Sequence, residues 1–458
     1  MTHDLLRNSV GQACRRFGGA LFAATVLAIA ALCLLDVDAR AAGLDRSFGN
    51  GGVVRSVAGK GGEIARYADG RLVVAGADAG EFVVARFLGD GTPDLSFGSG
   101  GVARVEWTAP FRDTQRDDAK ASAVAVQPDG RILVGGSYEP NRGMYGGGAW
   151  RAVMARLNPD GSLDQGFRSV NAPPGKVQLR RPFWREFRAI ALQKRKIVVA
   201  GETGFVARLN ADGTLDRSFA KGHGSLNIPP KPKNKKRFMR LAGITGLLVA
   251  RSGRIFAAGY ANGRVLLSRL HPNGIFDRRF GFRGTVRVDT SKKRGCRCSL
   301  GLDLARDRRG RIVVSGVLLR RHPAAEFSAD DVQGPAFLVR FHRNGKLDRS
   351  FGARGVVRNP RTGGRSLRGG TGVAVQSNGR IVVAGQRFSK FAVGRYRPNG
   401  AWDRSFFGNG LFSASFGSGS AQASAALIGD GGRILASGHA LYGAGSVSPQ
   451  LLVVQIRP

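Results

Sequence analysis

Cysteine is scarce in this chain, at four of 458 residues. Cys14 and Cys33 lie in the N-terminal segment, which leaves Cys296 and Cys298, two residues apart in a basic stretch. A pair this close forms a strained ring when oxidised, and it supplies only half of a tetrahedral zinc site. A loop disulfide, two unused thiols and a metal site are the alternatives. In each case stability must come from an apolar core, because there are too few cross-links to provide it.

Helical patterns and catalytic signatures are also missing. Beyond residue 41 no segment has a sustained 3.6-residue apolar period, and none is long and apolar enough to cross a membrane. The chain contains neither a Gly-x-Ser-x-Gly elbow nor a phosphate-binding Gly-Lys-Ser loop. Its histidines are dispersed, without the spacing of metal ligands. These absences favour an all-β protein, and we predict no cofactor and no bound metal.

The N-terminus is typical of an export signal. Arg7, Arg15 and Arg16 precede an apolar run over 18–35, and Ala39-Arg40-Ala41 has the form of a cleavage site. We therefore predict a signal peptide over 1–41 and a mature domain over 42–458, secreted or held at a bacterial cell envelope. The arginine pair partly matches a twin-arginine signal. The apolar run is also long enough to leave an uncleaved anchor as an alternative.

Two phrases recur through the mature chain about every 50–70 residues, which indicates a repeat architecture. One is an apolar strand, a Pro-Asp-Gly type of turn and a second apolar strand, as in residues 123–136. The other is Leu-Asp-x-Ser-Phe or a near copy, which we call the motif. Its aspartates are Asp45, Asp94, Asp164, Asp216, Asp277, Asp348 and Asp403.

Each repeat divides into four predicted strands, at 101–105, 122–127, 131–136 and 152–157 in the second unit. A four-stranded unit repeated radially predicts a seven-bladed β-propeller. The chain after the signal starts with a motif and one strand, and it finishes with a strand over 451–456. We therefore predict that the N- and C-terminal strands share one blade and close the ring, which leaves no long bare sheet edge. An open solenoid is the alternative.

The combination of these phrases resembles the delta-60 repeat family of bacterial surface and secreted proteins. The quoted motifs are Leu-Asp-x-Ser-Phe-Gly, Gln-Pro-Asp-Gly-Arg-Ile-Val-Val-Ala-Gly and Ala-Arg-Leu-Asn-Pro-Asp-Gly, and the match extends from Leu44 to the end. The resemblance implies a propeller-like array and an extracellular setting, with no catalytic activity to transfer. Units depart from the pattern at 165–166, at 192–196, where the Asp-Gly turn is lost, and at Trp402. We expect distortion in those blades.

An arginine stands eight residues before six of the seven motif aspartates. A calcium loop has a similar spacing, but an arginine stands where its first ligand would be. We interpret each arginine as binding its aspartate in a bidentate manner, as a structural clip on the turn between blades. The motif phenylalanine should wedge between neighbouring blades. The position is occupied by Arg86, Arg156, Arg208, Arg269, Arg340 and Arg395, with Gln455 in the last unit.

Long insertions fall only in the first-to-second and third-to-fourth connections of the repeat. In a meander these connections emerge on one face, where loops on a rigid scaffold usually carry recognition. Two insertions are strongly basic and partly aromatic, and they provide our predicted binding residues: Lys176, Arg180, Arg181, Trp184, Arg185, Lys231, Lys233, Lys235, Lys236 and Arg237.

The charge balance points to an anionic partner. The chain has 71 Lys and Arg against 32 Asp and Glu, a formal net charge of +39, which attracts polyanions. An address outside the membrane favours an acidic polysaccharide or a cell-wall polymer over nucleic acid, and a protein partner is also open. Arginine-rich composition without a specific ligand is the plain alternative. We predict a monomeric, non-catalytic binding module. The alternative function is a polysaccharide hydrolase or lyase using Glu326, Asp330 and Asp331.

Overall fold

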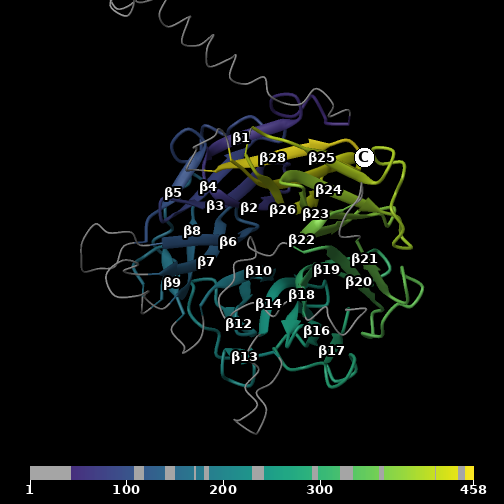
Figure 1. The fold of residues 1–458 in the computed structure, drawn as a ribbon. Helices are drawn as coiled ribbons and strands as arrows, with labels where there is room; N and C mark the ends of the chain where they lie inside the picture. Colours follow the sequence, from purple (N-terminus) through teal and green to yellow (C-terminus); the bar gives the residue numbers. More distant parts are fainter. Residues whose placement is uncertain are drawn as a thin grey trace, which may run out of the picture. The chain divides into compact units, whose positions relative to one another are not determined.

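The computed structural model describes residues 43–107, 118–139, 150–169, 172–179, 185–228, 242–290, 298–319, 334–359, 366–417, 419–441 and 449–458. The predicted signal peptide lies outside them. Residues 42–458 form one compact unit. It contains seven antiparallel sheets of four strands, the predicted seven-bladed propeller (Figure 1). Within the described ranges, no helix has the length and apolar character needed to cross a membrane.

Each blade runs from an inner to an outer strand in chain order. Blade 1 contains β2 (Lys60–Arg66), β3 (Leu72–Asp78), β4 (Glu81–Phe87) and β5 (Val102–Val105). Blade 2 contains β6 (Asp118–Val126), β7 (Ile132–Glu139), β8 (Arg151–Leu157) and β9 (Lys176–Gln178). Blade 3 contains β10 (Phe187–Gln193), β11 (Lys196–Gly201), β12 (Phe205–Leu209) and β13 (Ser225–Asn227).

The second half of the ring repeats this order. Blade 4 contains β14 (Ala242–Val249), β15 (Ile255–Ala261), β16 (Arg264–Leu270) and β17 (Thr285–Val288). Blade 5 contains β18 (Cys298–Arg306), β19 (Ile312–Leu319), β20 (Ala336–Phe341) and β21 (Val356–Arg358). Blade 6 contains β22 (Arg368–Val375), β23 (Ile381–Arg387), β24 (Lys390–Tyr396) and β25 (Leu411–Ala414).

Blade 7 combines the two ends of the chain. It contains β26 (Ala421–Ile428), β27 (Ile434–Ala440) and β28 (Gln450–Ile456), with β1 (Val53–Ala58) as its outer strand. β1 and β28 are antiparallel, with Val53 opposite Val454 and Val54 opposite Val453. Figure 1 shows the purple β1 beside the yellow β28. The prediction that the ends share one blade and close the ring is confirmed.

The motif lies inside each blade, and this corrects its predicted place between blades. It belongs to the segment that joins the third strand to the outer strand, as residues 88–101 join β4 to β5. The connection between blades is instead the one that leaves the outer strand, where many insertions lie. The strand predicted first in each unit is therefore the outer strand of the preceding blade. The sequence pattern marks the repeat but not the point at which one sheet ends.

Adjacent sheets pack face to face through small and β-branched side chains. One buried cluster joins Val73 and Val84 of blade 1 to Ile132 and Val134 of blade 2, with the motif Phe97 between them. The motif phenylalanines are buried in this way throughout, with Phe97, Phe167, Phe219, Phe280 and Phe351 all at 0% exposure. Burial of such a side chain contributes about 1.5–3 kcal/mol.

Blade 3, one of the blades expected to be distorted, is regular. In blade 3 the lost Asp-Gly turn is replaced by Lys194 and Arg195, and Gln193 still pairs with Lys196 across the hairpin. Lys194 adopts the positive φ, 55°, that glycine adopts elsewhere. In blade 6, Trp402 stacks on Tyr396 with ring centroids 4.4 Å apart. The prediction of distortion is wrong here, because tertiary packing holds these turns without the usual residues.

The ring has two different faces. The hairpin turns between inner and second strands and the motif segments emerge on one face, which we call the turn face; Arg71 of a hairpin lies 3.7 Å from Asp94 of a motif. The other connections leave the opposite ends of the strands, which define the loop face. Most of the predicted long insertions fall in residues that the structure does not describe, but the strand ends flanking them, such as Val105 and Glu139, lie on the loop face.

Candidate functional site

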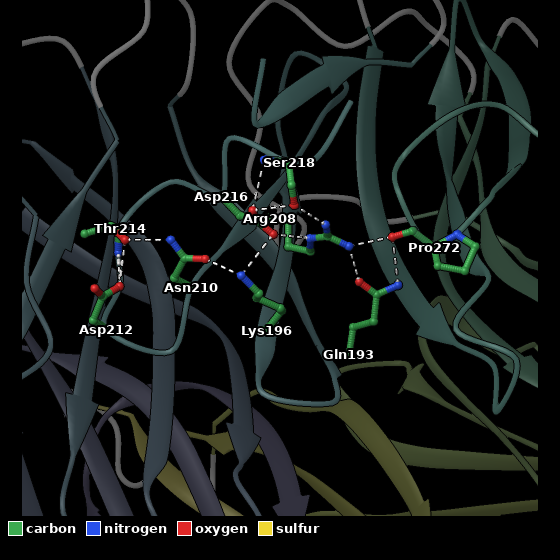
Figure 2. Close-up of polar contacts among 9 residues, drawn as sticks. All are labelled: Gln193, Lys196, Arg208, Asn210, Asp212, Thr214, Asp216, Ser218 and Pro272. Carbon is green, nitrogen blue, oxygen red and sulfur yellow. Dashed lines mark hydrogen bonds and ion pairs between the residues drawn. The ribbon is translucent and has the colours of Figure 1, made fainter. Parts of the chain in front are cut away.

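The repeated arginine is the centre of the junction between two blades. Arg208 donates from Nε to Asp216 Oδ2 at 2.7 Å and from Nη2 to Ser218 Oγ at 3.2 Å, both within its own blade. Its Nη1 donates to Pro272 O of the next blade at 2.5 Å (Figure 2). The guanidinium also lies 4.7 Å from the centroid of the Phe219 ring. One buried side chain therefore connects a carboxylate, a hydroxyl, an aromatic ring and a neighbouring blade.

This junction recurs around the ring. The Nε-to-aspartate contacts are Arg86–Asp94 at 2.8 Å, Arg156–Asp164 at 2.7 Å, Arg269–Asp277 at 3.0 Å, Arg340–Asp348 at 2.7 Å and Arg395–Asp403 at 2.8 Å. In four of these the Nη1 group also donates to a carbonyl of the next blade, at Pro159, Ala211, Arg343 and Pro398. The predicted bidentate fork is corrected: the carboxylate contacts Nε alone, Nη1 reaches across the blade boundary, and Nη2 donates to the motif serine of the same blade where that bond forms.

A second cation contacts every motif aspartate, and sequence analysis missed it. It is the residue that follows the hairpin turn, such as Arg131, whose Nε lies 3.0 Å from Asp164 Oδ2. Lys196 takes the same place 3.4 Å from Asp216 (Figure 2). In blade 7, Arg433 lies 2.6 Å from Asp45, and Gln455 donates to the same oxygen at 3.1 Å. Both positions are repeated in the sequence, but only the fold brings them to one carboxylate.

Two of the motif carboxylates, Asp45 and Asp216, have strongly lowered pKa values. Burial raises the pKa of Asp216, but hydrogen bonds from Ser218 and Arg208 lower it by a larger amount. The pKa of Asp216 is therefore lowered to about 2. The pKa of Asp45 also falls to about 2, chiefly because the Ser47 hydroxyl donates to the carboxylate.

Acid should therefore weaken the fold in a defined window. A carboxyl with a depressed pKa contributes stability that is complete above its ordinary pKa, 3.8, and is lost as the pH falls through about 2. We expect the urea midpoint to drop between about pH 4 and pH 2. Asp216→Asn should be less stable at pH 7 and show a shallower drop. If both proteins lose stability in parallel over this range, Asp216 does not contribute to the acid transition.

A second set of polar contacts joins the inner strands around the central axis, where β2, β6, β10, β14, β18, β22 and β26 adjoin in turn. Hydroxyls at inner-strand bulges donate to the neighbouring strand, as Thr245 does to Gly301 O at 2.9 Å and Ser424 to Gly61 O at 3.1 Å. Asp303 instead accepts the Val373 N–H at 2.8 Å, and burial raises its pKa to about 6. These contacts fasten the innermost strands to one another.

One buried charge cluster lies beside the inner strands of blades 2 and 3. Arg188 Nη2 is 2.9 Å from Glu186 Oε2 and 3.1 Å from Glu202 Oε1, and Ser122 donates to Glu186. Burial raises the pKa of Glu186, and the adjacent guanidinium opposes that shift. Both carboxylates share one guanidinium, and the Ser122 hydroxyl connects this ion triad of blade 3 to blade 2.

The predicted binding residues are largely outside the described part of the chain. Of the ten, Lys176 and Arg185 are described, and both make contacts. Lys176 donates to Glu106 O and lies 5.2 Å from the Trp107 ring centroid, so it packs against blade 1. The remaining eight are not described: Arg180, Arg181, Trp184, Lys231, Lys233, Lys235, Lys236 and Arg237. Glu326, Asp330 and Asp331, which carried the catalytic alternative, also lie outside the described residues.

Of the two mature cysteines, only Cys298 is described. It is a buried free thiol at the start of β18, and burial raises its pKa to about 11. Among the described residues no group of three or more His, Cys, Asp or Glu side chains is arranged to hold a metal ion.

Exposed cations nevertheless occur on the described surface, on the turn face. The residue directly after the motif aspartate is an arginine in five blades, and it is exposed in each of them. In the part of the chain that the structure covers, none of these five forms an ion pair: Arg46, Arg217, Arg278, Arg349 and Arg404. The same repeat therefore supplies one buried, neutralised arginine and one exposed, uncompensated arginine.

Comparison with known proteins gives a fold and no activity. Residues 68–97, 127–167, 195–219 and 376–406 match a family described as "Domain of unknown function (DUF5122) beta-propeller". The match supports a propeller-repeat family. No curated protein matches the chain.

Solved propellers resemble it at low identity. A virginiamycin B lyase from Staphylococcus aureus is 10% identical, with 88% of this chain and 99% of that chain covered and a TM-score of 0.47. The Dos1 propeller is 10% identical, with 88% and 94% covered and a TM-score of 0.46. The WD40 propeller domain of Doa1 is 9% identical, with 88% and 95% covered and a TM-score of 0.42.

Proposed function

We propose that this protein is an exported, non-catalytic binding module that holds an anionic polymer at the bacterial cell envelope. The observation that carries the proposal is the exposed arginine that follows the motif aspartate in five of the seven blades. A guanidinium without a carboxylate partner is free to bind an external carboxylate or phosphate. Repetition of this group around a rigid ring suits a partner whose charges also repeat.

The surrounding chemistry supports binding more than catalysis. Six of the seven motif aspartates contact two cations each. The buried Glu186 and Glu202 share Arg188. A formal net charge of +39 attracts polyanions over long distances. The basic N-terminal segment and its small-x-small site support export. The motifs also lead us to assign the repeats to the delta-60 type.

Retention on an immobilised polymer tests the function. The full chain should bind polygalacturonate at low salt and elute as ionic strength rises, because exposed charge contacts are screened. Amylose, which is neutral, should retain none of it. The polymer should be recovered at its original length, as measured by size-exclusion chromatography. Absence of retention at low salt would contradict the binding function, and shortened polymer would contradict the non-catalytic assignment.

A further inference from the structure

Exposed charge is distributed unevenly over the turn face. In the hairpin turns and motif segments of blades 4 to 6, every carboxylate is buried: Asp277, Asp307, Asp348 and Asp403. The exposed cations of the same segments, apart from Arg254, which contacts Asp277, form what we call the arginine crescent: Arg251, Arg278, Arg279, Arg283, Arg308, Arg309, Arg343, Lys346, Arg349, Arg354, Arg397 and Arg404. Blades 1 to 3 differ, because their turns expose carboxylates such as Asp90 and Asp160.

One turn position changes from aspartate to asparagine at this boundary. In the turn between the third strand and the motif, blades 1 to 3 have Asp90, Asp160 and Asp212, and blades 4 to 6 have Asn273, Asn344 and Asn399. The side-chain oxygen accepts the same backbone hydrogen bond in blades 1 to 3 and in blades 4 to 6. Asp90 Oδ1 accepts the Thr92 N–H at 2.9 Å, and Asn344 Oδ1 accepts the Lys346 N–H at 3.0 Å. Either residue makes this turn, so the fold does not require the change.

The hairpin turns change in the same direction. Asp69 and Asp129 precede the turn glycine in blades 1 and 2, whereas Ser252, Arg309 and Asn378 precede it in blades 4 to 6. Both turn positions thus lack an acid in blades 4 to 6, and the hairpin of blade 3, Lys194-Arg195, lacks one as well. Arginine-rich composition alone would not remove acids from one arc and keep them on the other.

The arginine crescent also includes a hollow and an exposed aromatic ring. An open hollow of about 460 Å³ lies between the motif segment of blade 5 and the turn of blade 6, lined in part by Ser350, Ala353, Arg358 and Asn399. In blade 4 the Phe282 side chain is 78% exposed, with the Arg283 guanidinium 5.4 Å from its ring centroid. An exposed ring beside cations offers an apolar surface to a sugar ring.

We infer that the arginine crescent is the binding surface, and that its ligand is a linear acidic polysaccharide lying along the turns of blades 4 to 6. The inference rests on the proposed function and moves it from the predicted loop face to the turn face. Uronate carboxylates along the chain meet one group of guanidinium side chains per blade. The hollow and Phe282 contact the sugar rings between charges.

The asparagine positions provide a test that preserves the fold. In the full chain, Asn273→Asp, Asn344→Asp and Asn399→Asp together add three carboxylates to the crescent and keep the turns. Binding of a polygalacturonate oligomer, followed by titration calorimetry at low salt, should weaken about tenfold, since individually weak exposed charge terms add up across the site. The matched control is Asp90→Asn, Asp160→Asn and Asp212→Asn, which should bind within about twofold of the parent.

The outcomes separate the inference from the proposed function. If the two triple variants shift affinity by similar amounts in opposite directions, net charge governs binding and the crescent is not the site. If charge reversal of Lys231, Lys233, Lys235, Lys236 and Arg237 abolishes binding while the asparagine variant does not, the loop face binds and only the inference fails. If the parent does not bind, both fail. Tighter binding of single-stranded DNA of equal charge would overturn the ligand class.

Discussion

Replacing Asp348 with alanine is expected to lower the free energy of unfolding by about 3–5 kcal/mol, because it leaves a buried guanidinium without its counter-charge. The Arg340 and Asp348 side chains are 3% and 2% exposed, so water cannot replace the lost carboxylate. Arg340 would still donate to Pro398 O of the next blade, which prevents it from swinging into solvent. Urea denaturation followed by circular dichroism at pH 7 gives the change.

Asp45 provides the matched control at the same repeat position. Its partners are Arg433, whose side chain is 45% exposed, and the neutral Gln455. Asp45→Ala leaves a cation that water can solvate, so it should cost less than half of the Asp348→Ala loss, about 1–2 kcal/mol. Equal losses at the two positions would show that burial of the arginine is not the source of the effect.

The sequence was sufficient to predict the architecture because the relevant signals are local and repeated. The number of strands follows from alternating small and β-branched residues, from glycine at the turns and from seven copies of the motif. The two incomplete ends predict a shared blade. The eight-residue spacing in the sequence was enough to predict the contact between Arg208 and Asp216. It did not predict Pro272, which lies in the next blade, or the convergence of Lys196 on the same carboxylate, since these contacts depend on how the sheets stack.

The binding surface was harder to predict for a related reason. Long basic insertions are conspicuous in a sequence, and because of them we predicted a binding surface on the loop face. The exchange of Asp90, Asp160 and Asp212 for Asn273, Asn344 and Asn399 was also present in the sequence. It has no meaning until the fold places those turns on one face with the hairpins, whose arginines, such as Arg251 and Arg309, come earlier in the chain. Charge patterns on a ring become visible only after the blades are assigned.

Deleting residues 43–58 is expected to prevent formation of a stable monomer. The deletion removes β1 and the first motif, and with them Leu44, Phe48, Val53 and Val54, which are 4%, 1%, 2% and 6% exposed. At about 1.5–3 kcal/mol each, their loss is comparable with the whole stability of a typical domain, about 5–15 kcal/mol. It also bares the edge of β28 for pairing with other chains. Size-exclusion chromatography should show aggregates.

The same segment should restore the fold when it is attached to the other end of the chain. Arg457 N–H donates to Gly43 O at 2.9 Å, as Arg397 N–H donates to Ala401 O at 2.7 Å in blade 6. The turn in blade 6 is Arg397-Pro398-Asn399-Gly400-Ala401. In blade 7, Arg457-Pro458 corresponds to its first two residues and Gly43 to its last. Two residues equivalent to Asn399 and Gly400 would connect them. Appending Asn-Gly and then residues 43–58 after Pro458 completes that turn in a single covalent path.

We expect this relinked chain to be monomeric and at least as stable as the parent, because the closing strand no longer has to be recruited from the distant end of the chain. A copy carrying Val54→Asp should fail to rescue, since Val54 is buried against blade 1. Thermal denaturation compares the four proteins: the parent, the deletion variant, the relinked chain and its Val54→Asp copy. If the deletion variant unfolds at the parent's temperature, or if both appended segments rescue equally, then pairing of β1 with β28 does not hold the ring closed.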